Sequence, residues 1–122
     1  MNFSSASRKW TVSNGGFEPQ VLITIFLQSV AKHLPREALG HAKIYVEFDG
    51  GAAFGSSTLI PDELHVQTTG TFSEGDIRIG AALIFGDVER SILLAALEIA
   101  EHDVETQLKC RMLTPGDMNH GT

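Results

Sequence analysis

The chain has 122 residues, enough for a single domain to bury a hydrophobic core without disulfide or metal support. Apolar residues make up 43% of it and charged residues 20%, a balance that excludes disordered and fibrous proteins. The formal net charge is −6, and Cys110 is the single cysteine, which excludes an intrachain disulfide. We expect one domain over residues 1–122, with loose tails at residues 1–7 and 114–122.

The acidic residues are unevenly spread along the chain. Residues 1–48 carry five Lys and Arg against three Asp and Glu, whereas residues 49–122 carry four against twelve. An acidic surface repels phosphate backbones, so we expect no nucleic-acid partner. A protein partner with a basic surface, or self-association into a homo-oligomer, is electrostatically easier.

No stretch of the sequence suggests a signal peptide or a membrane helix. The first ten residues lack the apolar core of a signal peptide. The uninterrupted apolar runs are far shorter than the roughly 20 residues that a membrane helix needs. A single cysteine fits a reducing compartment. We expect a cytoplasmic protein without membrane contact.

The first half of the chain shows a strand, a helix and a second strand in order. Residues 8–13 alternate apolar and polar side chains and predict a short edge strand. Residues 19–34 predict a helix because Pro19 suits a first helical turn, Pro35 ends it, and six apolar residues share one arc. These six are Leu22, Ile23, Phe26, Leu27, Val30 and Leu34. Residues 42–48 alternate strictly, which predicts a strand with one buried face and one wet face.

Residues 49–62 show no regular pattern and are rich in glycine. A loop of this length inside a compact domain is uncommon and often functional. Its backbone N–H groups could also bind an anion. A candidate small-molecule site is therefore placed here, with these residues: Asp49, Gly50, Gly51, Phe54, Asp62, Glu63 and His65.

Two further strands are predicted as a hairpin, at residues 64–72 and 77–85, with Gly75 in the connecting turn. The second of these strands alternates at first and then becomes apolar on both faces over residues 81–85. An apolar stretch of this kind has to be covered on both sides. We expect the helices to cover one side and a loop or another subunit to cover the other.

The last regular element is one long helix from Asp87 to about Met112. Asp87 suits the N-cap position, and Glu89 complements the helix dipole in the first turn. The first half of the helix is apolar over most of its circumference, whereas the second half narrows to a single seam. We expect this seam and the apolar strand before the helix to form an oligomer interface, with these residues: Ala82, Ile84, Val104 and Leu108.

No catalytic or metal-binding constellation stands out. Glu98, His102 and Glu105 share a helical face, but that face points away from the apolar stripe and predicts a solvated surface. Cys110 lies near the C-terminal end of the predicted helix, where the dipole raises the pKa of a thiol, so we expect a structural role. We expect no cofactor and no metal.

These patterns predict an α+β fold with two layers and a long C-terminal helix. A mixed or antiparallel sheet of about four strands carries two helices, in the order β-α-β-β-β-α. The leading hypothesis is a small acidic protein that acts through protein–protein interaction, as an oligomeric adaptor, regulator or inhibitor rather than an enzyme. The alternative is a small-molecule-binding protein or enzyme with its site at residues 49–63.

Overall fold

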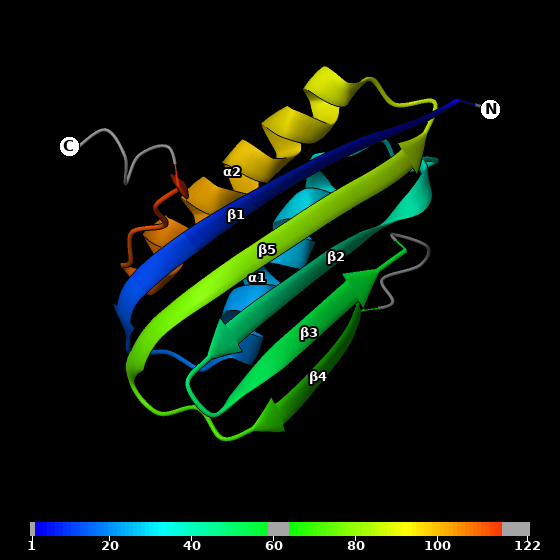
Figure 1. Cartoon of the computed structure of the whole chain (residues 1–122). Helices are drawn as coiled ribbons and strands as arrows, with labels where there is room; N and C mark the ends of the chain where they lie inside the picture. The colour runs from blue at the N-terminus through cyan, green and yellow to red at the C-terminus, as the bar shows by residue number, and fades with distance from the viewer. Residues whose placement is uncertain (1, 59–63, 116–122) are drawn as a thin grey trace.

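A computed structural model describes residues 2–58 and 64–115. Their chain forms one antiparallel sheet and two helices, which confirms the α+β class with five strands in place of four (Figure 1). The elements are β1 (Phe3–Gly15), α1 (Pro19–Lys32), β2 (Leu39–Phe48), β3 (Gly51–Ser57), β4 (Leu64–Gly70), β5 (Gly75–Gly86) and α2 (Arg90–Leu108). Neither helix in this part of the chain is long and apolar enough to cross a membrane.

The sheet has the strand order β1-β5-β2-β3-β4, and both helices lie on the same side of it. Helix α1 packs on β2, β3 and β4, whereas α2 packs on β1 and against α1. In Figure 1 the sheet faces the viewer and the helices lie behind it. The described chain therefore covers one face of the sheet and leaves the other open.

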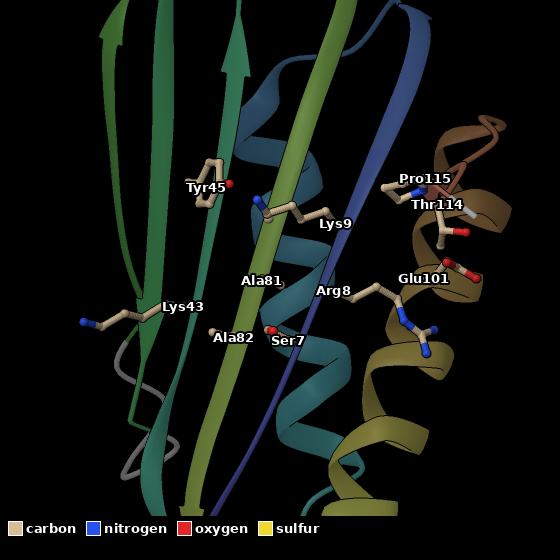
Figure 2. A pocket seen from close by; sticks show the side chains of 11 residues that line it. Ser7, Arg8, Lys9, Lys43, Tyr45, Ala81, Ala82, Glu101, Thr114 and Pro115 are labelled. Carbon is tan, nitrogen blue, oxygen red and sulfur yellow. The ribbon is translucent and has the colours of Figure 1, made fainter. Parts of the chain in front are cut away.

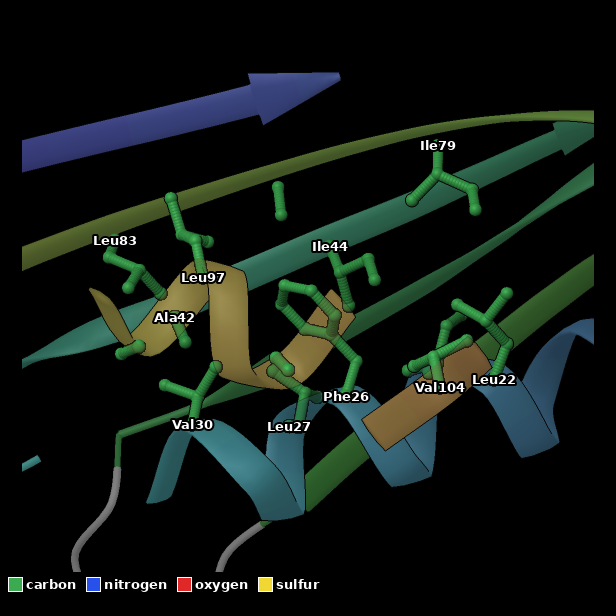
Figure 3. Packing of buried hydrophobic residues seen from close by; sticks show 14 of the residues in the cluster. Leu22, Phe26, Leu27, Val30, Ala42, Ile44, Ile79, Leu83, Leu97 and Val104 are labelled. Carbon is green, nitrogen blue, oxygen red and sulfur yellow. The ribbon is translucent and has the colours of Figure 1, made fainter. Parts of the chain in front are cut away.

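The side-chain alternation of β5 explains why this strand is central. Ile77, Ile79 and Leu83 point toward the helices and are buried, together with Ala81 and Phe85. They pack with apolar side chains from α1, β2 and α2 (Figure 3). Each large side chain removed from water contributes about 1.5–3 kcal/mol. Placing β5 between β1 and β2 gives its apolar face neighbours on both sides.

Helix α1 confirms the predicted amphipathic helix. Pro19 occupies the first turn, and all six predicted apolar residues are buried. On the side that faces α2, the Ser29 hydroxyl donates a hydrogen bond of 2.6 Å to Asp103. This bond joins the two helices at a buried serine, 4% exposed. The helix ends at Lys32, two residues before the predicted end.

Strand β1 is longer than predicted, because it begins at Phe3 rather than at residue 8. Residues 3–7 are thus strand and not a loose tail. They pair with β5 in continuous register from Phe3 opposite Gly86. The small polar residues of this segment have weak strand propensity, so its conformation is decided by pairing with a buried strand.

The predicted glycine-rich loop is wrong, because most of it forms β3. A two-residue turn at Asp49 and Gly50, where Gly50 has a φ of 98°, connects β2 to β3. Gly55 lies under α1, where a Cβ would collide with the side chain of Ile23. Glycine at this position thus permits the close approach of helix and sheet. The residues after Thr58, up to Glu63, lie outside the described part.

The predicted hairpin between the fourth and fifth strands is also wrong. β4 pairs with β3 at the edge of the sheet, and β5 pairs with β1 and β2. The apolar β5 gains more from a central position than from pairing with the polar β4. The chain between them crosses the end of the sheet through Phe72, whose ring contacts that of Phe48.

Helix α2 is shorter than predicted at both ends. Asp87 is not the N-cap: it has a φ of 58°, and its N–H donates a 2.7 Å bond to the Asn2 carbonyl. The helix begins at Arg90 and ends before Lys109, whose left-handed conformation turns the chain back toward the sheet. Leu113 then exchanges two backbone hydrogen bonds with Thr11, of 2.8 and 2.9 Å. The segment after α2 consequently lies along the outer edge of β1.

Candidate functional site

The open face of the sheet is the main surface that the described chain leaves uncovered. Seven large apolar side chains are exposed in the described part, and four of them lie here. They are Phe3 (62% exposed), Leu39 (47%), Phe54 (52%) and Ile84 (40%). Scattered apolar residues are normal on a protein surface, but their concentration on one face makes this face the candidate site for an interaction.

Three of these side chains form what we name the apolar corner, consisting of Phe3, Leu39 and Ile84. The strand register places Phe3 and Leu39 on either side of Gly86, and Ile84 lies one row further along β5. Gly86 has no side chain to separate the two flanking residues. Residues that are distant in sequence thus form one apolar area at the end of the sheet.

The centre of the open face is hollow because β5 has only small residues there. Gly80 and Ala82 form the floor, and a Cβ at Gly80 would collide with the ring of Tyr45, which lies over it. Lys9 and Lys43 stand on the neighbouring strands, and Lys9 extends across β5 toward Tyr45 (Figure 2). We name these five residues the central hollow. The depression has a volume of about 930 Å³ and continues round the edge of β1, past Arg8 and Glu101, to Thr114 and Pro115.

The central hollow is basic, in contrast to the protein as a whole. Lys9 and Lys43 are exposed, and neither forms an ion pair with another residue of the described chain. The acidic residues on this face, Glu47 and Asp76, lie together at the far end with Arg78. Arg78 and Glu47 approach to 3.4 Å as an exposed pair. Between the apolar corner and the central hollow, the paired residues of β1, β5 and β2 on this face therefore include Lys9 and Lys43 but no Asp or Glu.

Four acidic residues of α2 instead hold the helix to the rest of the chain. Glu98 pairs with Arg8 at 3.7 Å, and Glu101 accepts a hydrogen bond from the indole N–H of Trp10. The two remaining contacts are from Ser29 to Asp103 and from the Met112 N–H to Glu105, at 2.9 Å. Each of these carboxylates contacts another part of the chain, but Glu98 stays exposed at the surface, as sequence periodicity predicted, and Glu105 is half-buried.

The predicted small-molecule site does not assemble. Asp49, Gly50 and Gly51 lie at the turn between β2 and β3, whereas His65 pairs with Ser56 near the opposite end of β3. Five residues of strand separate these ends by about 17 Å. Asp62 and Glu63 lie outside the described residues. Phe54 and His65 share a hollow of about 510 Å³ on the open face beside Tyr45, and Phe54 shares a second hollow, of about 490 Å³, with Gly51.

The predicted interface residues divide between two surfaces. Ala82 and Ile84 point to the open face, as the alternation of β5 requires. Val104 is fully buried within the chain, and Leu108 is half-buried against the core, so the expected seam is covered internally. The segment after α2 folds back over this end of the helix, where the Met112 N–H contacts Glu105. No local pattern in the sequence indicates that the chain reverses direction there.

Within the described ranges, no group of three or more His, Cys, Asp or Glu could hold a metal ion. The pKa of the Cys110 thiol is raised, chiefly by burial and secondly by the negative charge of Glu105. The direction agrees with the expectation for a cysteine after a helix, but the main cause is desolvation rather than the helix dipole.

The alternation of β2 predicts that Lys43 and Tyr45 face outward, but it does not predict that Lys9 and Gly80 lie beside them. The usable signal was the run of small residues in β5, which indicates a depression wherever that strand is central.

The chain matches no protein-family model, no curated protein and no solved structure.

Proposed function

We propose that this protein is a non-catalytic interaction module that binds an acidic protein partner on the open face of its sheet. The observation that carries the proposal is the composition of that face. It combines the apolar corner with the ammonium groups of Lys9 and Lys43, which form no ion pair within residues 2–58 and 64–115, on a chain whose formal net charge is −6. Apolar area supplies the binding energy, and the local charge selects the partner.

The size of the open face suits a protein partner. Five strands about 4.8 Å apart, with lengths near ten residues, give a surface of roughly 20 Å by 30 Å. This is about 600 Å², close to the roughly 800 Å² that each partner contributes to a standard interface. A partner that covers the face would also bury Ile84 and Phe54, which the chain itself leaves exposed.

Charge makes an acidic surface the best complement of this face. Two copies of the chain stacked face to face would bring the lysines of one central hollow close to those of the other, which is unfavourable. The partner with a basic surface that the sequence suggests stays a prediction. Four carboxylates of α2 that could attract such a partner already have partners inside the chain. Interaction through the open face does not require them.

Capture experiments with charge-reversed variants test the proposal. The tagged protein is incubated with extract of the cells that produce it, and captured proteins are identified by mass spectrometry. We expect an acidic protein whose recovery falls at least tenfold with Lys43→Glu, because like charges at an interface are strongly unfavourable. Lys32→Glu is the matched control, since Lys32 is also exposed but lies on α1, behind the sheet.

The same experiment with Ile84→Glu tests the apolar corner. This substitution adds a negative charge to an exposed position, so the fold is retained and an acidic partner is repelled. Circular dichroism verifies that each variant is folded. Equal recovery of the partner with Lys43→Glu, Ile84→Glu and Lys32→Glu would contradict the proposal, and so would a captured partner with a basic surface.

A further inference from the structure

One flank of the described sheet lacks Asp, Glu, Lys and Arg. The described residues of β3, β4 and their neighbouring turns, 50–58 and 64–73, contain no Asp, Glu, Lys or Arg. Charged residues make up 20% of the chain, so 19 described residues without any are a marked departure from its composition; Asp62 and Glu63, between the two strands in sequence, lie outside the described residues. A strand without charged residues can pair with an identical strand without electrostatic repulsion between their side chains.

The outermost strand of this flank is an unprotected edge. In the described chain β4 pairs with β3 alone, and the four residues from Gln67 to Gly70 are all exposed. Natural sheets protect an edge with lysine, proline, a bulge or a very short strand. β4 is seven residues long, contains no lysine or proline, and pairs with β3 in unbroken register.

The opposite edge of the sheet is protected. Thr11 in β1 exchanges backbone hydrogen bonds with Leu113, and the Ser5 carbonyl accepts a 3.2 Å hydrogen bond from Arg90. Two cations, Arg8 and Lys9, lie between these positions. The fold thus blocks one edge of its sheet and leaves the other able to pair.

We propose that β4 pairs with β4 of a second copy of this chain, in antiparallel orientation, to give a closed dimer with a ten-stranded sheet. A two-fold axis through Gln67 pairs Gln67 with itself, Val66 with Thr68, and His65 with Thr69 of the second copy. None of these pairs brings two Asp, Glu, Lys or Arg residues together. Because β1 is protected, pairing stops at two chains and does not continue into a fibre.

The dimer extends the surface on which the proposed function rests. Antiparallel edge pairing has its two-fold axis perpendicular to the sheet, so both open faces lie on the same side. Two hollows and two apolar corners then belong to one continuous sheet surface. A partner with two binding sites would gain avidity from this arrangement. The dimer itself forms without any partner, so it is tested separately from the acidic partner.

Sedimentation velocity of the full chain between 1 and 100 µM tests the dimer, and no partner is present. We expect a species of about twice the 13.2 kDa chain mass. Gln67→Lys places two like charges opposite each other across the axis, so it should weaken the dimer at least tenfold. Gln107→Lys, the same substitution at an exposed position of α2, should leave it unchanged.

Hydrogen exchange gives a second measurement that does not depend on a substitution. The amides of residues 64–70 should exchange more slowly at 100 µM than at 1 µM, whereas those of β1 should not change. A monomer at every concentration would overturn the proposal. A dimer that survives Gln67→Lys would also overturn it, as would one without concentration-dependent protection of β4. Loss of the dimer with a retained acidic partner would leave the proposed function standing.

Discussion

Replacing Gly55 by alanine should destabilise the protein, although the same change usually stabilises a strand. Alanine in place of a strand glycine contributes about 0.5–1 kcal/mol through reduced chain entropy. At this position, however, the new Cβ collides with the Cγ2 of Ile23 and lies 3.0 Å from the Cδ1 of Leu27. Ile23 is fully buried and β-branched, so its side chain cannot rotate away. Overpacking of this kind costs about 1–3 kcal/mol.

The net expectation for Gly55→Ala is a loss of about 1–2 kcal/mol, or a fall in Tm of about 4–8 °C. Urea and thermal unfolding can be followed by the fluorescence of the single tryptophan, Trp10, which is buried against Phe26. Gly16→Ala is the matched control, because a Cβ at Gly16 meets nothing within 4 Å. Its stability should equal or slightly exceed that of the wild type.

A double-mutant cycle with Ile23→Ala isolates the collision. Ile23→Ala alone should cost about 2–5 kcal/mol, as expected when a buried side chain is truncated. With that side chain shortened, Gly55→Ala should become neutral or stabilising. Equal effects of Gly55→Ala in the two backgrounds, or a single variant as stable as the wild type, would refute the close packing of α1 on β3.

Two further predictions concern α2. Asp103→Ala should lower the free energy of unfolding by about 1–3 kcal/mol, because it leaves the buried Ser29 hydroxyl without its acceptor. Ser29→Ala should lower it by less. In urea unfolding of the double variant, the two losses should not add, because both substitutions remove the same hydrogen bond. Glu105→Gln should lower the raised pKa of the Cys110 thiol, because one of its causes is removed. Iodoacetamide should then react faster with Cys110 at pH 8 than in the wild type, since more thiolate is present. An unchanged rate would show that Glu105 does not act on the thiol.

Local patterns were sufficient for the elements whose sequence is strongly periodic. The apolar arc of α1 and the alternation of β2 specify both the element type and the face that is buried, and the structure agrees with them. For α2, the sequence predicted that a helix is present but not the residues at which it begins and ends. Its true start depends on the contact of Asp87 with Asn2, which lies 85 residues earlier in the chain.

The predictions that failed all depend on non-local contacts. Residues 51–57 have the composition of a loop, and they form a strand because β2 and β4 pair with them on both sides. Residues 3–7 become a strand for the same reason, through β5. Intrinsic strand propensity is weak compared with the free energy of completing a ladder on a buried sheet.

For β2 and the second half of β1, where the sequence predicted a strand, it also determined which side chains face water, because alternation along a strand has a fixed period of two. It could not determine which of those side chains are neighbours. Lys9 and Tyr45 are 36 residues apart, and they meet across Gly80 only because β5 inserts between β1 and β2. The central hollow and the apolar corner are therefore products of strand order and register, which tertiary packing decides and no local pattern encodes.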